Sequence, residues 1–327
     1  MIGDAGAPTD SPTASKTVFG VITATYNRPL TLAAAVQSVR DQSYQEWRMV
    51  VIDDSGSGLA THDLERSDPR ITVHVNKVNV GTNRSRNVGL DALLEHVDYI
   101  TFLDDDDRFS PEALEASARF ISRTGAKWAV SRRINADSGV SFTEVTEGQE
   151  EYDFVYDCMV ERRLRGDATH LIAADILRRS GARFPDEQQY LSEWRFWATV
   201  GSLTTAHFFE GATTLGANYE DDNLSTVSSR NVDFRTREIV DLYEFFSRQA
   251  VPDTKRKAVA TMFRSEIALI LPRAIAMRRL DLARQIIRAS EPSHLLVNKA
   301  LYRRLLRLPT AGVRNRLSAI FGSKQAR

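Results

Sequence analysis

Four consecutive aspartates at residues 104–107 are the side chains in this sequence whose type and spacing are best suited to chemistry. They follow residues 99–103, an apolar run of mainly β-branched and aromatic side chains that predicts a buried strand. Ser110-Pro111-Glu112 comes next and predicts the start of a helix, with serine as the cap and proline in the first turn. We therefore expect the acids at the C-terminal end of a strand, where open α/β sheets bind their ligands.

A run of acids is often no more than a solvated turn. Adjacent anions repel one another, however, and a fold tolerates them most easily when a hard divalent cation sits among them. Because a strand precedes this run and a helix follows it, we interpret residues 104–107 as a metal site. Ligands that offer only oxygen suit Mg²⁺ or Mn²⁺ better than a softer metal.

The pattern of apolar residues predicts the elements that must position these acids. Strands are expected at residues 18–23, 48–52, 71–76, 99–103 and 127–132, with helices at residues 30–42 and around residues 88–94. This alternation is typical of an α/β fold with a mostly parallel, doubly wound sheet flanked by helices. Later in the chain we expect an active-site loop with short strands at residues 144–157, a strand at 168–173, helices at 175–181 and 191–200, and a polar strand or loop at 218–229.

The charge of the chain is unevenly distributed, although its formal total is zero. Residues 255–327 carry 17 Lys and Arg against 3 Asp and Glu, so the rest of the chain has an equal excess of acids. Helical periodicity continues from residue 235 to residue 307 and predicts a basic helical appendage. Residues 295–321 could lie on an anionic membrane surface, pack against a partner subunit, or pack against the acidic body. Aromatic side chains for base stacking are scarce there, which argues against nucleic acid.

The composition is that of an ordinary globular protein, with 42% hydrophobic and 26% charged residues. Cys158 is the only cysteine, which excludes an internal disulfide and fits a cytoplasmic location. Residues 1–16 are expected to be disordered and lack the apolar core of a signal peptide. No apolar run reaches the roughly 18 residues needed to span a bilayer. We expect a cytoplasmic protein, at the inner face of the membrane if the basic helices bind lipid.

Four short landmarks occur in a characteristic order, each after an expected strand. They are Thr25-Tyr26-Asn27, Asp53-Asp54, residues 79–89, and the acid run that begins Asp104-Asp105-Asp106. In this order they resemble the landmarks of the inverting family 2 glycosyltransferases, which have the GT-A fold, and the acid run is similar to that family's DxD motif. The resemblance covers roughly residues 18–229. It implies a GT-A domain over residues 17–230, divided into a nucleotide-binding half (17–132) and an acceptor half (133–230), and followed by a helical region at 231–327.

The resemblance implies transfer of a sugar from a nucleotide diphosphate, with UDP favoured, to a saccharide, lipid-linked or other hydroxyl acceptor. Asp106 is then the direct metal ligand, and Asp104 reaches the ribose or, through water, the ion. The nucleotide-binding residues implied are Thr25, Tyr26, Arg28, Asp53, Asp54, Asn83, Arg86, Asp104 and Asp105. The chain departs from the family at Ala24, where a proline is usual, but the turn is preserved.

Transfer with inversion needs a general base that takes the proton of the acceptor hydroxyl. The family usually has Glu-Asp-Trp before an aromatic-rich helix, whereas residues 192–194 read Ser-Glu-Trp. Glu193 is therefore the implied base, although its carboxylate reaches one methylene further than an aspartate would. Asp186, Glu187 and His170 are alternatives, and one of the acids at residues 220–222 is a further candidate metal ligand.

Simpler roles compete with several of these assignments. Asp53 and Asp54 could cap a turn, Tyr26 could pack in the core, and Arg86 and its neighbour Arg84 could be solvated. Two other functions compete as well. A sugar nucleotidyltransferase would need a glycine-rich phosphate loop after the first strand, and residues 24–29 contain no glycine. A catalytically inactive binding module for a nucleotide sugar or glycan has no reason to keep four repelling anions.

Overall fold

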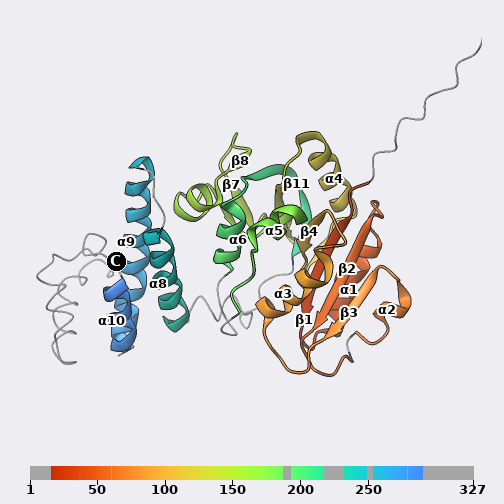
Figure 1. Cartoon of the computed structure of the whole chain (residues 1–327), viewed down its shortest axis with the longest axis horizontal. Coiled ribbons are helices and arrows are strands. Elements are labelled where there is room, and N and C mark those ends of the chain that lie inside the picture. Colours follow the sequence, from red (N-terminus) through yellow and green to blue (C-terminus); the bar gives the residue numbers. More distant parts are fainter. Residues whose placement is uncertain are drawn as a thin grey trace, which may run out of the picture.

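A nine-stranded mixed sheet forms the centre of the molecule (Figure 1). The computed structural model describes residues 16–59, 61–186, 193–216, 232–248, 253–277 and 279–289. The strand order is β3-β2-β1-β4-β10-β6-β11-β5, and β8 also pairs with β11. These strands are β1 (Phe19–Thr25), β2 (Trp47–Asp53), β3 (Ile71–Val75), β4 (Tyr99–Phe102), β5 (Arg108–Phe109), β6 (Trp128–Asn135), β8 (Glu151–Tyr152), β10 (Ala168–Ala173) and β11 (Ala206–Gly216).

The expected α/β fold with a mostly parallel sheet is confirmed. Strands β3, β2, β1 and β4 are parallel neighbours, as are β6 and β11. Strand β10 is antiparallel to both β4 and β6, and its insertion joins the two parallel parts of the sheet. Strand β11 was not expected, because polar residues and a glycine interrupt its apolar pattern and its pairing with β6 contains register shifts.

Helices flank the sheet, and most of them follow a strand along the chain. Those of the first two thirds are α1 (Pro29–Arg40), α2 (Leu64–Ser67), α3 (Thr82–Leu93), α4 (Ala113–Thr124), α5 (Ala174–Ser180) and α6 (Trp194–Gly201). Helix α4 begins three residues after Ser110, so the expectation that Ser110 caps it is wrong. The Ser110 carbonyl accepts bonds from Ala113 N and the Gln42 amide, and this ties the start of α4 to α1.

Residues 144–157, expected to form an active-site loop with short strands, include the end of the short strand β7 (Thr143–Val145), the whole of β8 and the start of a π-helix. Strands β7 and β9 (Leu164–Gly166) pair in antiparallel fashion, and the π-helix η1 (Phe154–Val160) lies between them in the chain. The Asp153 side chain accepts a hydrogen bond from Tyr156 N and caps this helix.

Helix α3 approaches β1 closely because residue 89 is a glycine. A Cβ atom at Gly89 would lie 2.5 Å from the Cγ2 atom of the buried Ile22. We expect Gly89→Ala to lower the free energy of unfolding by about 1–3 kcal/mol, because the methyl group overpacks this contact. Asp91→Ala, on the exposed side of the same helix, is the control in urea unfolding. Equal stability of the two variants would contradict the tight packing of α3.

Helix α6 rests on an aromatic layer over the sheet. The ring centroids of Trp197 and His170 are 4.3 Å apart, and Trp197 also meets Phe102 edge-on. Phe196 stacks on Phe184 with 4.0 Å between the ring centroids. Such aromatic contacts add to the burial that fixes a helix on a sheet. The layer therefore sets the position of the N-terminal end of α6, where Glu193 lies.

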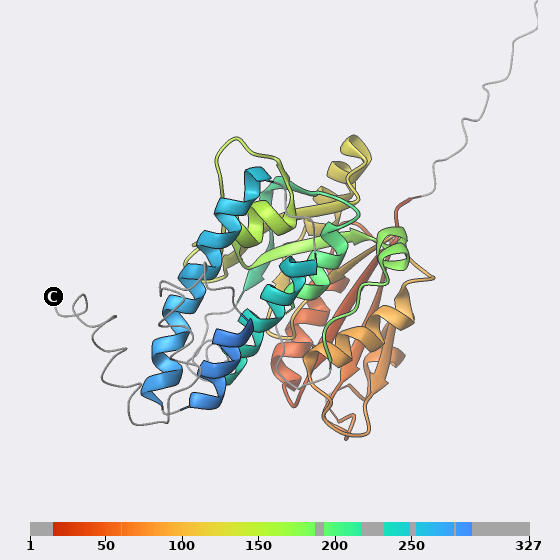
Figure 2. The ribbon, with the colours of Figure 1, turned by 60° about the vertical axis from the view of Figure 1, so that its left-hand side comes forward.

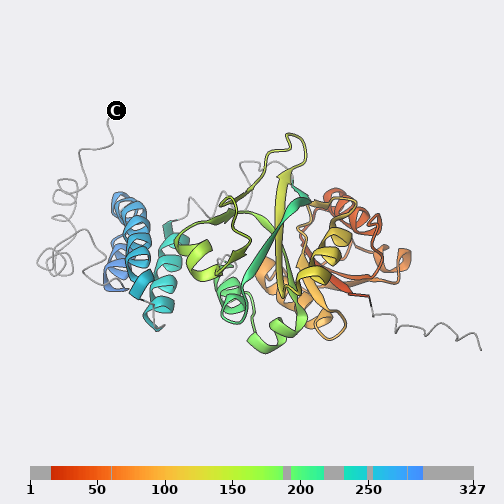
Figure 3. The same cartoon turned by 90° about the horizontal axis from the view of Figure 1, so that it is seen from above.

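Three C-terminal helices form a second hydrophobic core. They are α8 (Val232–Arg248), α9 (Asp253–Ala276) and α10 (Leu280–Ala289), and all three were expected. Figures 2 and 3 show them together at one end of the molecule, with the strands β1–β3 at the other. Their core also includes Val155 of η1 and Trp194 of α6, so the three helices pack against these two elements.

Ion pairs add to this packing. Arg195 pairs with Asp241 at 2.5 Å, and Lys255 pairs with Glu161 at 2.8 Å. Among the described helices none is long and apolar enough to cross a membrane. The expectations for residues 1–15, 218–229 and 295–321 lie outside the described residues.

Candidate active site

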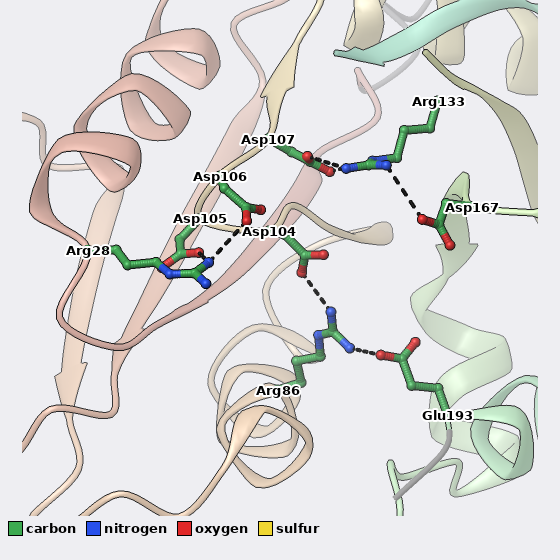
Figure 4. A network of polar contacts seen from close by, with 9 residues as sticks. All are labelled: Arg28, Arg86, Asp104, Asp105, Asp106, Asp107, Arg133, Asp167 and Glu193. Carbon is green, nitrogen blue, oxygen red and sulfur yellow. Dashed lines mark hydrogen bonds and ion pairs between the residues drawn. The ribbon is translucent and has the colours of Figure 1, made fainter. Parts of the chain in front are cut away.

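The four aspartates form a tight turn after β4, and each pairs with an arginine, Asp104 with Arg86, Asp105 and Asp106 both with Arg28, and Asp107 with Arg133 (Figure 4). The turn is closed by a hydrogen bond of 3.1 Å from Asp107 N to the Asp104 carbonyl. Consecutive side chains of the turn point in different directions, so three arginines from three elements can each reach one part of it. The repulsion expected from the sequence is thus partly balanced by cations of the protein itself.

Arg86 of α3 joins the acid turn to the start of α6. Its Nη2 donates to Asp104 Oδ1 at 2.7 Å, and its Nη1 donates to Glu193 Oε1. Burial lowers the pKa of Arg86, but the two carboxylates raise it by more, so the guanidinium stays charged. Desolvation by the surrounding protein raises the pKa of Asp104, but Arg86 and the other two arginines together attract its carboxylate more strongly and lower this pKa below its usual range. Asp104, which is expected to lie near the ribose or the ion, and Glu193, the expected base, are therefore bridged by one buried cation.

Arg28 and Thr25 hold the middle of the acid turn. Thr25 Oγ1 donates to Asp105 Oδ2 at 2.7 Å, and Arg28 Nη1 donates to Asp105 Oδ1 at 3.1 Å and to Asp106 Oδ2 at 3.0 Å. Asn27 has a φ of 55°, a left-handed conformation that asparagine adopts more easily than most residues. Pro29 then starts α1. This sharp turn directs the Arg28 side chain back toward the acids.

Arg133 of β6 holds the last acid in a buried ion pair. Its Nε and Nη2 donate to the two carboxylate oxygens of Asp107 at 2.7 and 2.6 Å. Its Nη1 lies 3.5 Å from Asp167, which connects β9 to β10. Burial raises the pKa of Asp107 to about 6 although Arg133 lowers it, and burial also raises the pKa of Asp167. The sequence pattern did not single out Arg133 or Asp167, and no local signal marks either one.

The family model for Glycosyl transferase family 2 matches residues 20–179, which contain β1, the acid turn and β10. Residues 20–179 are a domain of this family. TarS 1–349 of S. aureus, solved in complex with UDP-GlcNAc, superposes on this chain with a TM-score of 0.62 at 16% identity, over 85% of this chain and 82% of that chain. At this identity the likeness supports the GT-A fold alone.

Two curated relatives illustrate the range of sequence similarity. "Putative teichuronic acid biosynthesis glycosyltransferase TuaG" of Bacillus subtilis is 28% identical over 48% of this chain and 62% of its own length. "GalNAc(5)-diNAcBac-PP-undecaprenol beta-1,3-glucosyltransferase" of Campylobacter jejuni is 34% identical over 29% of this chain and 32% of its own. The matches thus span between about a third and three fifths of the relatives' length.

Several of the expected nucleotide-binding residues have structural partners within the chain. Asp53 is fully buried and accepts bonds from Ser55 N and Thr61 Oγ1. The two oxygens of Asp54 accept bonds from the Asn76 amide and from the backbone N–H groups of residues 80 and 81, which precede α3. Both acids thus organise loops at the C-terminal ends of the strands, and a contact with a nucleotide base stays a prediction for them.

The remaining nucleotide-binding candidates differ in exposure. Tyr26 is 50% exposed, so it does not pack in the core. Asn83 is buried and donates to the Pro185 carbonyl at 2.8 Å, which ties α3 to the segment before Glu193. Arg84 lies on the exposed face of α3, unlike Arg86. The structure thus brings Arg28, Arg86 and residues 104–107 together, and leaves Arg84 outside this group.

The exposed oxygens of the acid turn suit a divalent cation. The Asp104 side chain is 56% exposed and that of Asp106 is 30% exposed, and both offer only oxygen ligands. Within the described residues, no three His, Cys, Asp or Glu side chains gather into a complete site. Mg²⁺ is usually held by one or two carboxylates together with substrate phosphates and water. The donor set of Asp104 and Asp106 fits a cation of this kind.

The alternatives to Glu193 are less well placed where the structure describes them. His170 Nδ1 accepts a hydrogen bond from Trp128 Nε1 at 3.1 Å, and burial lowers the pKa of the His170 imidazole, as expected for a neutral structural histidine. Asp186 is exposed at the edge of the described segment. Glu187 and residues 220–222 lie outside the described residues.

Proposed function

We propose that this chain transfers a sugar from a UDP-sugar to an acceptor hydroxyl with inversion, assisted by Mn²⁺ or Mg²⁺. The observation that carries the proposal is the Arg86 bridge, which holds the acid turn and Glu193 next to each other at the C-terminal end of β4. A donor held by the acid turn would therefore have its reacting carbon within reach of an acceptor at Glu193. The family match supports a glycosyltransferase over a nucleotidyltransferase.

The residues have separate roles in this proposal. Asp106 and Asp104 would hold the cation, which neutralises charge that develops on the diphosphate leaving group. The acceptor oxygen attacks the anomeric carbon as the bond from that carbon to the diphosphate oxygen breaks. Glu193 Oε2 takes the proton of the acceptor hydroxyl, while Arg86 keeps the Glu193 side chain in place through Oε1.

The names of the relatives support a role in cell-surface polysaccharide synthesis. One of them is named for teichuronic acid biosynthesis, and another for a sugar chain linked through diphosphate to undecaprenol. We propose an acceptor of the same class, a saccharide on a diphosphate-linked lipid. The expected cytoplasmic location at the inner face of the membrane belongs to this proposal.

A thermal-shift panel of UDP, GDP, dTDP and CDP, each with and without Mn²⁺, tests the donor class. A ligand that binds only the folded state raises the melting temperature, by roughly 5 °C at about 100 times its Kd. We expect a shift that needs Mn²⁺ and is largest for UDP. We also expect wild-type protein to release UDP slowly from a UDP-sugar in the presence of Mn²⁺.

Two variants sharpen the panel. Asp106→Asn should lose the Mn²⁺-dependent shift, whereas Asp253→Asn, at an exposed position on α9, should keep it. No shift with any nucleotide in folded protein would contradict the proposal. A normal shift without any release of UDP from a panel of UDP-sugars would instead favour an inactive binding module.

A further inference from the structure

Arg28 is the most exposed of the three arginines that contact the acid turn. Its side chain is 47% exposed, whereas those of Arg86 and Arg133 are 10% exposed. One nitrogen, Nη1, donates to both Asp105 and Asp106. Arg86 and Arg133 each use two or more nitrogens on their carboxylate partners. Arg28 is therefore the cation that can leave the turn with the least change in the rest of the protein.

The surroundings of Arg28 keep the turn intact if its side chain moves. Thr25 Oγ1 holds the other oxygen of Asp105. The Arg28 backbone carbonyl accepts the Leu32 N–H at 3.0 Å, so the start of α1 fixes the main chain whatever the side chain does. A guanidinium on a long, half-exposed side chain can change partners by rotation about its own bonds.

We propose that Arg28 is an internal counter-ion of Asp106 that competes with the divalent cation and turns to the donor diphosphate when the cation binds. This inference rests on the proposed function, because it assumes that Asp106 is a metal ligand. A cation at Asp106 repels the Arg28 guanidinium at short range. A diphosphate offers that guanidinium a new anionic partner, to which arginine bonds in bidentate fashion. Binding of cation and of nucleotide is then mutually favourable, and the coupling is reciprocal.

Mn²⁺ titration of nucleotide-free protein, followed by the electron paramagnetic resonance signal of free Mn²⁺, tests the competition without any turnover. We expect Arg28→Gln to bind Mn²⁺ about tenfold more tightly than wild type, because one competing positive charge is removed. Arg119→Gln, an exposed charge on α4, is the matched control and should equal wild type. Asp106→Asn should lose the site. Melting temperatures of all variants show that each is folded.

The same titration with UDP present tests the coupling. UDP should tighten Mn²⁺ binding by a larger factor in wild type than in Arg28→Gln, because the variant has no guanidinium that can turn to the diphosphate and bind it. If Arg28→Gln without UDP bound Mn²⁺ no more tightly than wild type, the proposed competition would be wrong. If UDP tightened Mn²⁺ binding by the same factor in both proteins, the proposed contact of Arg28 with the diphosphate would be wrong. If no variant binds Mn²⁺ with or without UDP, the inference and the proposed metal dependence both fail. If wild type binds Mn²⁺ and Asp106→Asn does not, the proposed metal site is supported, and the two comparisons of Arg28→Gln with wild type decide the inference alone.

Discussion

Glu193→Gln is expected to lower sugar transfer by about 100- to 10,000-fold while leaving nucleotide binding unchanged. A general base contributes an effect of about this size. The glutamine oxygen can still accept the bond from Arg86, so the bridge to Asp104 survives and only the proton acceptor is lost. The variant should therefore keep the Mn²⁺-dependent thermal shift with UDP. Transfer is measured with the donor selected by the nucleotide panel and with free saccharide and diphosphate-polyprenol-linked acceptors.

Two comparisons make this result specific. Glu244→Gln, at an exposed position on α8, should transfer at the wild-type rate. Asp106→Asn should lose transfer and the thermal shift together, which separates loss of the donor site from loss of the base. If Glu193→Gln kept nearly full transfer while Asp106→Asn lost it, Glu193 would not be the base. The family assignment would stand, and Asp186 and Glu187 would be the next variants.

The elements that could be predicted are those with an uninterrupted local pattern. Residues of β1, β2 and β4 are nearly all buried, and their apolar runs are recognisable without any partner strand. Strand β11 contains Glu210 and Gly211, so its local pattern is broken and only pairing with β6 makes it a strand. The position of β10 between β4 and β6 is likewise a matter of long-range pairing, which the order of elements does not reveal.

The same distinction applies to the site. The acid turn and Glu193 carry local signals, because each lies at the end of an element with a clear pattern. Their partners do not, since Arg133 is 26 residues from Asp107 and Arg86 is 107 residues from Glu193. Three arginines balance part of the repulsion between the acids, one from the turn before α1, one from α3 and one from β6. The sequence alone did not assign any of them to this role.

Arg133→Met is expected to lower the free energy of unfolding by about 3–5 kcal/mol at neutral pH, because it leaves the buried Asp107 carboxylate without its cation. Arg132→Met is a control from the adjacent position, where side chains of a strand point to the opposite face. Arg132 pairs with the exposed Glu210 and donates to the Thr143 carbonyl at 3.0 Å, so its loss should cost about 1–2 kcal/mol, less than the loss of Arg133. Urea unfolding at pH 7 measures both variants.

The pH dependence of this cost identifies Asp107 as its cause. Arg133 is the group that lowers the pKa of Asp107 in the folded protein, so the variant should have a folded-state pKa above the value of about 6. The unfolded chain keeps the ordinary pKa of an aspartate, near 4. Between these two values the folded state binds more protons than the unfolded state, and stability therefore falls as pH rises. The destabilisation by Arg133→Met should be smaller at pH 5 than at pH 8. An equal cost at both pH values would assign the effect to lost packing of the arginine against Phe142 instead.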